Sequence, residues 1–536
     1  MTSSVRREVV IGVDVGTTAA KVVAFEVGPD EPGDPLSTGI REYPLIRPRS
    51  GWRVQDPTAV TTGTVAALRE CVEGLVAVGR EPVDVIALCV STAMHAVIGF
   101  DEQARPLTPI VTWADARARD VARELRATPL AAQLQRTSGT PVHSMAPLTK
   151  LRWFALHEPG LAVSATTWAG LKDLILHALT GRLVTELSSA SGTGLLDIAT
   201  RSWDPEAVGL AGLLPQQMPP ILATTEALPL ADAVAREVGL PAGTPVVVGA
   251  GDGPLGNLGT GALRRGVAGL SLGTSGALRL VVDGPYADPS GRLFCYALTD
   301  DRWVVGTPIS NGGAVVRWAR DVFVADRPGA PARQPPEAAP EVTDAEVLEL
   351  AAAVPPGAEG LVMLPFLLAE RGPLWDADVR GAFLGIRQHH ARGHFIRAAV
   401  EGVAFQLATI LDGLDEVTPV TSIHGTGGVF RSDLWREVLA AVLGRPLVVT
   451  AGAEGTALGA AALGLLAVGR ARTLEQAVET LSPGILEEAG HDATIVASEA
   501  DSAAYRAARV SAKGRLEDLR ASADLLAGPA SRTPDP

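Results

Sequence analysis

A short segment near the N-terminus places a carboxylate directly before a glycine-threonine turn. Asp14 lies in an apolar run that alternates at period two, and Gly16, Thr17 and Thr18 follow it. Such a turn offers backbone N–H groups and hydroxyls to an anion, and a carboxylate two residues earlier can hold a metal ion through water. The pattern therefore suits a magnesium complex of a nucleoside triphosphate.

The same turn recurs half a chain later. Residues Val13 to Ala19 read Val-Asp-Val-Gly-Thr-Thr-Ala, and residues Leu270 to Gly276 read Leu-Ser-Leu-Gly-Thr-Ser-Gly. Apolar strand residues follow both turns, so each copy predicts a β-hairpin. Two such hairpins predict two domains of one ancestral design, although Gly-Thr turns also recur by chance.

Two further glycine-rich segments follow apolar strands. Residues 425–428 come after one strand and open a helical pattern, which suits the close approach of a purine and its ribose but is equally typical of an ordinary turn. Asp252 follows the apolar strand 246–248 and has glycine on both sides. An aspartate at a strand end can take a proton from an alcohol, or it can simply form a turn.

Polar and aromatic side chains gather directly after two strands expected over 83–90 and 109–111. They are Met94, His95, Trp113, Asp115 and Arg117. One such residue alone is more often part of a core. Two clusters at neighbouring strand ends favour a polar pocket with an apolar wall, which is what a polyol needs.

The elements that position these residues alternate along the chain. A hairpin is expected over 11–25, a helix over 52–78 with an Asp56-Pro57 start, a strand over 83–90 and a helical stretch over 117–134. This alternation predicts an α/β protein. The longest apolar stretch, residues 456–469, predicts a buried helix.

The composition excludes several classes of protein. The chain has 536 residues, 47% of them hydrophobic, so it is globular and long enough for two large domains. Its net charge of −14, without a Lys/Arg block, disfavours nucleic acid and anionic membranes as partners. Three scattered cysteines and a charged N-terminus predict neither disulfides nor a signal peptide, and we expect a cytoplasmic protein.

In this order, the segments from Val10 to about Ser482 resemble the FGGY carbohydrate kinase family of the actin/hexokinase-like superfold. The most specific match is Gly381 to Ile386 followed, after seven residues, by His394 to Glu401. The resemblance implies an α/β fold with two actin/hexokinase-like (ribonuclease H-like) domains and a catalytic cleft between them. The domains it implies are an N-terminal domain with the sugar site and phosphate hairpin (1–255), a C-terminal domain with the nucleotide site (256–485), and a helical segment with a frayed tail (486–536).

The resemblance also implies roles for single residues, with ATP and Mg²⁺ as cofactors. Asp252 would be the general base on the sugar hydroxyl, and Asp14 would be the carboxylate linked to Mg²⁺. The implied nucleotide-binding residues are Gly16, Thr17, Thr18, Lys21, Gly273, Thr274, Gly313, Gly427, Gly428 and Ser432. The implied sugar-binding residues are Met94, His95, Trp113, Asp115, Arg117 and Lys172.

Within the family, several segments are similar to gluconate kinases. They are residues 91–95, 110–117, 137–150, 292–299 and 311–318. This implies phosphorylation of D-gluconate to 6-phospho-D-gluconate, with Arg117, His95 or Lys172 meeting the substrate carboxylate. A kinase for xylulose or another polyol or ketose is the alternative, and a non-catalytic ATP-binding actin-fold protein is a more distant one. A homodimer is one assembly that we consider. Many relatives carry an amide residue directly after the catalytic aspartate, where this chain has Gly253.

Overall fold

The computed structural model describes residues 7–28, 35–323, 343–450, 455–486, 494–510 and 514. The chain divides into two compact units. The first contains residues 1–269, 279–306 and 452–489, and the second contains residues 270–278, 307–451 and 490–536. The Pro-rich segment 328–340 and the tail from residue 528, both singled out in the sequence, lie outside the described residues.

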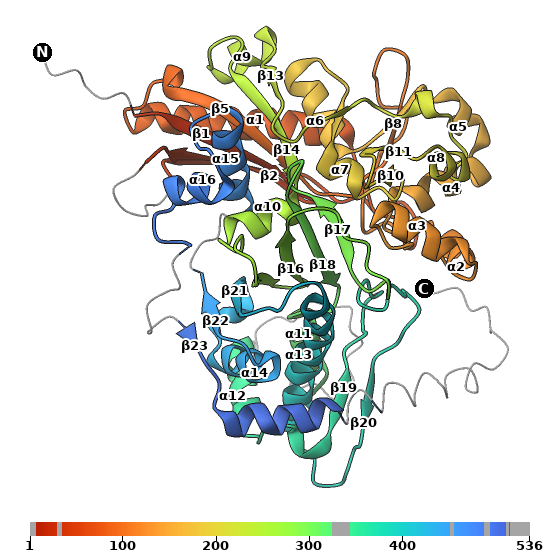
Figure 1. The fold of residues 1–536 in the computed structure, drawn as a ribbon, viewed down its shortest axis with the longest axis vertical. Helices are drawn as coiled ribbons and strands as arrows, with labels where there is room; N and C mark the ends of the chain where they lie inside the picture. The colour runs from red at the N-terminus through yellow and green to blue at the C-terminus, as the bar shows by residue number, and fades with distance from the viewer. Residues whose placement is uncertain are drawn as a thin grey trace, which may run out of the picture. The chain divides into compact units, whose positions relative to one another are not determined.

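A six-stranded sheet forms the centre of the first unit (Figure 1). Its strands, in spatial order, are β13 (Ala227–Pro229), β14 (Pro245–Gly251), β5 (Val85–Thr92), β1 (Val9–Val15), β2 (Ala19–Glu26) and β3 (Ser37–Glu42). Strands β1 and β2 pair antiparallel, which confirms the first predicted hairpin. Strands β14, β5 and β1 run parallel, so their carboxyl ends meet at one edge of the sheet.

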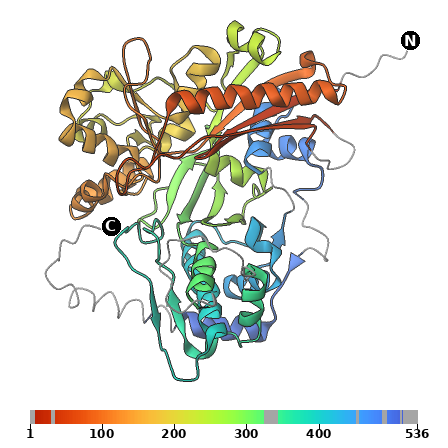
Figure 2. The same ribbon diagram turned by 180° about the vertical axis from the view of Figure 1, so that it is seen from behind.

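Helices cover both faces of this sheet. Helix α1 (Pro57–Ala77) crosses the face seen in Figure 2, and α15 (Gly455–Ala467) covers the face seen in Figure 1. Asp56 caps α1 by accepting a hydrogen bond from the Thr58 N–H (2.8 Å). Both helices come very close to the strands because glycine faces them. A Cβ at Gly12 would stand 2.1 Å from the Ala457 carbonyl oxygen of α15.

The remaining described elements of the first unit form a second apolar core around Leu148, Phe154 and Trp168, or flank the sheet. They are β4 (Val54–Gln55), η1 (Pro82–Asp84), β6 (Ile98–Phe100), β7 (Ile110–Val111), α2 (Arg119–Arg126), α3 (Leu130–Ser138), α4 (Pro147–His157), α5 (Pro159–Ser164), β8 (Thr167–Ala169), α6 (Leu171–Thr180), β9 (Thr185–Glu186), α7 (Leu187–Ser191), β10 (Leu196–Asp197), β11 (Ser202–Trp203), α8 (Pro205–Leu210), η2 (Pro215–Gln217), β12 (Ile221–Leu222), α9 (Asp232–Val238), α10 (Asp252–Gly259), β17 (Phe294–Ala297) and α16 (Leu474–Leu481). The helical stretch expected over 117–134 is two helices, α2 and α3.

A second sheet has seven strands in the order β17-β18-β16-β15-β21-β22-β23. The second hairpin, β15 and β16, is adjacent within it, as predicted. The elements not yet given are β15 (Val267–Leu272), β16 (Gly276–Val282), β18 (Trp303–Ile309), α11 (Ala314–Phe323), α12 (Asp344–Ala352), η3 (Ala358–Gly360), β19 (Val362–Leu364), β20 (Ala382–Leu384), α13 (Arg392–Val417), β21 (Ser422–Thr426), η4 (Gly428–Arg431), α14 (Asp433–Leu443), β22 (Leu447–Val449) and β23 (Thr494–Ile495). A helix over 499–510 follows.

Helix α13 is the central helix of the second unit and contacts α11, α12 and α14. Its length and mean hydropathy of 1.2 would suffice to cross a membrane, but 83% of its most apolar window is buried inside the protein. It is therefore a core helix. Helices α15 and α16, which the predicted boundaries assign to the C-terminal domain, pack within the first unit.

Candidate active site

Asp14 sits near the carboxyl end of β1, beside the equivalent end of β5. Its neighbours in the sheet are Lys21 of β2 and Ser91 of β5, and the Ser91 hydroxyl donates to Asp14 Oδ1 (2.9 Å). Burial is the main cause that raises the pKa of Asp14 to about 7, and the negative charge of Asp252 adds to it. Ionisation of this carboxyl group costs free energy because the group is removed from water. Carboxyl groups with a pKa raised in this way are often found at functional sites.

Asp252 follows β14 and is the first residue of α10. The preceding residue, Gly251, pairs with Thr92 of β5, so Asp252 emerges at the sheet edge where Asp14 lies. Asp252 Oδ1 accepts the N–H of Gly253 (2.8 Å). The sheet thus brings two carboxylates from distant parts of the sequence close enough for each to affect the charge of the other.

This pair of carboxylates fits a magnesium ion better than a transition metal. Oxygen is the ligand that Mg²⁺ prefers, usually from one or two carboxylates together with substrate phosphates and water. Among the residues that the structure describes, no group of three or more His, Cys, Asp or Glu side chains could enclose a metal ion. Asp14 could hold Mg²⁺ that is shared with a phosphate, with the charge of Asp252 nearby.

Three side chains fasten the turn at residues 16–18. The Tyr43 hydroxyl donates to the Gly16 carbonyl (2.8 Å), and the Gln55 amide donates to the Thr17 carbonyl (2.9 Å). The Trp113 indole N–H donates to the Thr17 hydroxyl oxygen (2.9 Å). Thr18 is exposed. Trp113, expected to line a sugar pocket, is thus bound to the glycine-threonine turn.

Met94 and His95 follow β5 on the same edge. His95 has φ +67°, a left-handed conformation that few non-glycine residues adopt, and such strain concentrates at functional sites. Its Nδ1 lies 2.8 Å from the Gly192 carbonyl oxygen. Met94 packs against Gly251, where a Cβ would stand only 2.5 Å from the Met94 sulfur. Met94 is therefore directly beside the residue that precedes Asp252.

Asp115 and Arg117 bind each other. Arg117 Nε and Nη2 donate to the two carboxylate oxygens of Asp115 (2.8 and 3.0 Å), and both side chains are buried. The guanidinium also stacks over the Trp52 ring at 3.7 Å. The N–H groups of the Arg117 guanidinium thus bind Asp115, and one face of the guanidinium is covered by Trp52.

Lys172 is also bound to groups of the protein itself. Its ammonium donates to the carbonyl oxygens of Val90, Val248 (2.8 Å) and Ala250 (3.0 Å), and Glu186 lies 4.0 Å away. An ammonium has three N–H donors, so these carbonyls use all of them. Lys172 ties β5 to β14.

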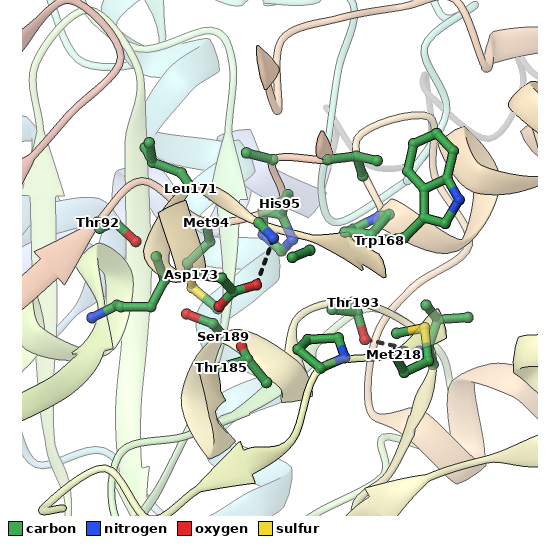
Figure 3. A pocket seen from close by; sticks show the side chains of 18 of the residues that line it. Thr92, Met94, His95, Trp168, Leu171, Asp173, Thr185, Ser189, Thr193 and Met218 are labelled. Carbon is green, nitrogen blue, oxygen red and sulfur yellow. Dashed lines mark hydrogen bonds between the residues drawn. The ribbon is translucent and has the colours of Figure 1, made fainter. Parts of the chain in front are cut away.

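A small, partly open cavity of about 40 Å³ is lined by Met94, His95 and residues of the second apolar core (Figure 3). Three of the buried polar atoms in its lining have no hydrogen-bond partner in the described part of the chain: Thr92 Oγ1, Trp168 Nε1 and Asp173 Oδ1. Burial raises the pKa of Asp173 to about 7. A volume of this size suits a few water molecules and is by itself too small for a six-carbon sugar acid.

The second unit contains a much larger cavity, of about 730 Å³. Five residues expected at a nucleotide line it: Gly273, Thr274, Gly313, Gly428 and Ser432. Gly427 does not line it. Its φ is +120°, and a Cβ there would stand 2.2 Å from the Leu272 carbonyl oxygen, so Gly427 lets β21 approach β15. A cavity of this size and backbone composition can hold a nucleotide.

Two family models together match most of the chain. The N-terminal domain of the FGGY family of carbohydrate kinases matches residues 9–259, and its C-terminal domain matches residues 268–468. The chain belongs to this family. It is a carbohydrate kinase with the two-domain α/β fold of that family, and FGGY kinases use ATP.

Relatives of this FGGY kinase cover nearly the whole chain. It is 37% identical over 465 residues to the gluconokinase of Bacillus subtilis (strain 168), covering 86% of this chain and 88% of the relative. The crystal structure of gluconate kinase from Lactobacillus acidophilus matches with a TM-score of 0.86 and 30% identity, covering 96% and 99% of the two chains. Ligand-bound xylulose kinase from the same organism gives the same four values.

The FGGY kinase thus brings together most of the residues that its sequence singled out, in two places. The first unit gathers Asp14, Gly16, Thr17, Thr18, Lys21, Met94, His95, Trp113 and Asp252 around one sheet edge. Sequence reasoning missed four residues that hold turns and loops. Tyr43 and Gln55 hold the first turn, Lys150 donates to the His95 carbonyl oxygen (2.8 Å), and Arg317 donates to the Thr274 hydroxyl oxygen (2.9 Å). Lys150 ends a segment that resembles gluconate kinases, but nothing in that motif indicated which atoms it binds.

Proposed function

We propose that this kinase transfers the γ-phosphoryl group of ATP to the 6-hydroxyl of D-gluconate. The observation that carries the proposal is the 37% identity to a gluconokinase, against 27% and 30% to xylulose kinases of Bacillus subtilis and Escherichia coli over similar lengths. Xylulose is the second candidate, because a xylulose kinase structure matches this chain as well as a gluconate kinase structure does.

Asp252 is the general base in this proposal. Its support is its position at the carboxyl end of β14, beside Met94 and near a second carboxylate. A base there takes the proton of the sugar hydroxyl as its oxygen attacks the γ-phosphorus, and such proton transfer typically contributes about 10²–10⁴-fold to the rate. Met94 and His95 orient the sugar against this base.

Asp14 and the turn at residues 16–18 serve the phosphates. Bound Mg²⁺ neutralises charge on the phosphate oxygens. The Asp14 carboxylate is placed to hold that ion, and the turn's N–H groups and the Thr17 and Thr18 hydroxyls can donate to phosphate oxygens. In the second unit, the cavity around Gly273, Thr274 and Gly428 has the size and the glycine-rich lining to hold a nucleotide.

The substrate carboxylate needs donors of its own to offset the loss of water. Arg117 is already bound to Asp115, and Lys172 to three carbonyls. Of the three residues that the sequence offered, His95 is therefore our candidate for this contact. Arg117 and Lys172 then have a structural role.

A substrate panel tests the choice of sugar. We expect kcat/KM for gluconate to exceed that for xylulose, ribulose and glycerol, with ATP consumption as the readout. A higher kcat/KM for xylulose would overturn gluconate while leaving the kinase assignment intact.

The role of Asp252 has a separate test. Asp252→Asn should lower kcat by about 10²–10⁴-fold while calorimetry still detects binding of the sugar. Asp232→Asn, at an exposed aspartate that begins α9, is the matched control and should leave kcat unchanged. A variant at residue 252 that keeps most of its kcat would remove the general base from this position.

A further inference from the structure

Lys150 connects two segments that lie next to the proposed sugar site. It belongs to α4 and is completely buried. Its Nζ donates to the His95 carbonyl oxygen (2.8 Å) and to the Met145 carbonyl oxygen (2.7 Å). The first carbonyl belongs to the loop after β5, and the second to the loop that leads into α4. One side chain therefore joins both loops.

His95 needs such support because its backbone is strained. The left-handed conformation at φ +67° has to be maintained by surrounding contacts when the residue is not glycine. His95 is fixed at its carbonyl by Lys150, at Nδ1 near the Gly192 carbonyl, and at its ring edge by Tyr296, with 5.5 Å between the ring centroids. Of these three contacts, the one from Lys150 acts directly on the strained backbone.

The electrostatics of Lys150 fit a role as a hydrogen-bond donor more than as a charge. Burial lowers the pKa of Lys150 to about 7, although the carboxylate of Asp115 opposes this shift. Asp115 already has Arg117 as its ion-pair partner, so it does not need the charge of Lys150. A neutral amine has two N–H donors, and the carbonyls of His95 and Met145 use both.

We propose that Lys150 is a positioning residue for sugar recognition, which holds His95 in its left-handed conformation and so sets the place of the His95 ring. The proposal rests on the proposed function, in which His95 meets the sugar. Lys150 itself does not touch the substrate, and its effect passes through the His95 backbone.

Lys172 shows what a purely structural buried lysine does in the same unit. It binds carbonyl oxygens of β5 and β14, two strands that already pair with each other in the sheet. His95 lies beyond the end of β5 at Thr92 and has a strained backbone. Removal of Lys150 should therefore displace a loop, whereas removal of a strand-bound lysine should mainly lower stability.

Lys150→Met tests the proposal through the two Michaelis constants. We expect KM for the sugar to rise about tenfold, the effect of losing one buried hydrogen bond, while KM for ATP stays within about twofold of the wild-type value. Arg152→Met is the control. Arg152 lies on the same helix and donates to a carbonyl oxygen of Leu210 (2.8 Å), away from His95. Equal rises in both constants would overturn the proposal.

A double-mutant cycle shows whether Lys150 acts through His95. His95→Asn removes the ring but keeps a residue type that tolerates left-handed φ. We expect Lys150→Met to raise the sugar KM in the wild-type background and to change it little in the His95→Asn background. Additive effects would mean that Lys150 acts elsewhere and would overturn the proposal.

The test of Lys150 remains valid if the first variant does not fold and if gluconate is not the substrate. If Lys150→Met does not fold, Lys150→Gln, which keeps two N–H donors on a shorter side chain, takes its place, and equal rises in the KM values for the sugar and for ATP would overturn the proposal. The assays use whichever sugar of the panel is phosphorylated best. A wrong choice of gluconate therefore leaves the test of Lys150 intact.

Discussion

The two glycine-threonine hairpins share a sequence pattern but are fastened in different ways. In the first, the side chains of Tyr43, Gln55 and Trp113 hold the turn from outside the hairpin. In the second, main-chain hydrogen bonds provide most of the contacts that hold the turn. The N–H groups of residues 312–314 donate to the carbonyl oxygens of Gly273 and Thr274, between 2.7 and 3.2 Å. One side-chain bond, from Arg317 to the Thr274 hydroxyl oxygen (2.9 Å), is added.

The hairpins also differ at the position two residues before the glycine. The first has Asp14 there, buried and with a raised pKa, whereas the second has Ser271. The glycine-threonine turn is therefore repeated, but only the first copy has a carboxylate beside it. In our proposal, this one residue decides which hairpin can hold a metal ion.

We expect the largest effect on kcat when the Asp14 carboxylate, the feature that distinguishes the first hairpin, is removed. Asp14→Ala should lower kcat by about 10²–10³-fold, the usual result of losing an electrostatic contact to the reacting phosphate, with a changed dependence of the rate on Mg²⁺. Ser271→Ala should cost less than about tenfold, since no charge is lost. Steady-state kinetics over a range of Mg²⁺ concentrations measures both. An unchanged Mg²⁺ dependence in Asp14→Ala would show that the hairpins are chemically equivalent.

The sequence was sufficient to predict the elements that follow from local pattern. The first hairpin, α1 with its Asp56 cap, β14 followed by Asp252, and the buried helix α15 are all confirmed. These features depend on periodicity, glycine and capping residues, which act over a few positions. The family resemblance, confirmed by the matches over 9–259 and 268–468, added the pairing of distant segments.

The side-chain partners could not be predicted in this way. Arg117 lies two residues from Asp115, but only the fold shows that it turns back onto that carboxylate and stacks on Trp52. Likewise, Lys172 reaches carbonyls 76 to 82 positions away. Charged residues near a strand end look alike in sequence, whether they face a ligand or complete the protein's own hydrogen bonds.

A second prediction uses two adjacent glycines beside the second hairpin. Gly427→Ala forces a Cβ to within 2.2 Å of the Leu272 carbonyl and a left-handed φ on alanine, so we expect a loss of stability of about 1–3 kcal/mol. Gly428 has open space around its Cβ position and lines the nucleotide cavity. Gly428→Ala should keep the melting temperature and raise KM for ATP. Thermal unfolding and ATP kinetics separate the two, and equal melting temperatures would contradict the close approach at Gly427.

A third prediction sharpens the contrast between side-chain and main-chain fastening. Gln55→Leu removes the donor to the Thr17 carbonyl, a net loss of about 1 kcal/mol, and should raise KM for ATP several-fold by loosening the first turn. Arg317→Leu removes the single side-chain bond of the second turn, which the main chain of residues 312–314 still holds. Its effect on the unfolding free energy should be smaller. A larger loss of stability for Arg317→Leu would reverse the comparison.

The smallest expected effect is a pH-dependent change in the free energy of unfolding that is caused by Asp14. The pKa of Asp14 is about 7 in the folded protein against 3.8 for the ordinary group, so between about pH 4 and pH 7 the folded state binds more protons than the unfolded state. The free energy of unfolding therefore falls as pH rises through this window, and the full loss is present above pH 7. Asp14→Asn lacks this loss because it carries no proton to release.

Asp14→Asn should consequently melt at a higher temperature than the wild type at pH 8, by about 1 °C for each 1 kcal/mol recovered in a protein of this length, and the gain should shrink towards pH 4.5. Buried carboxyl groups that do not interact with Asp14 titrate alike in both proteins and cancel in the difference, whereas Asp252 loses a neighbouring negative charge in Asp14→Asn. Ser271→Ala, which removes no charge, should give a difference that does not depend on pH. Thermal unfolding at several pH values measures all three proteins. A gain for Asp14→Asn that is the same at pH 4.5 and pH 8 would mean that Asp14 ionises as an ordinary carboxyl group, and the first hairpin would then hold its charge at no cost in stability.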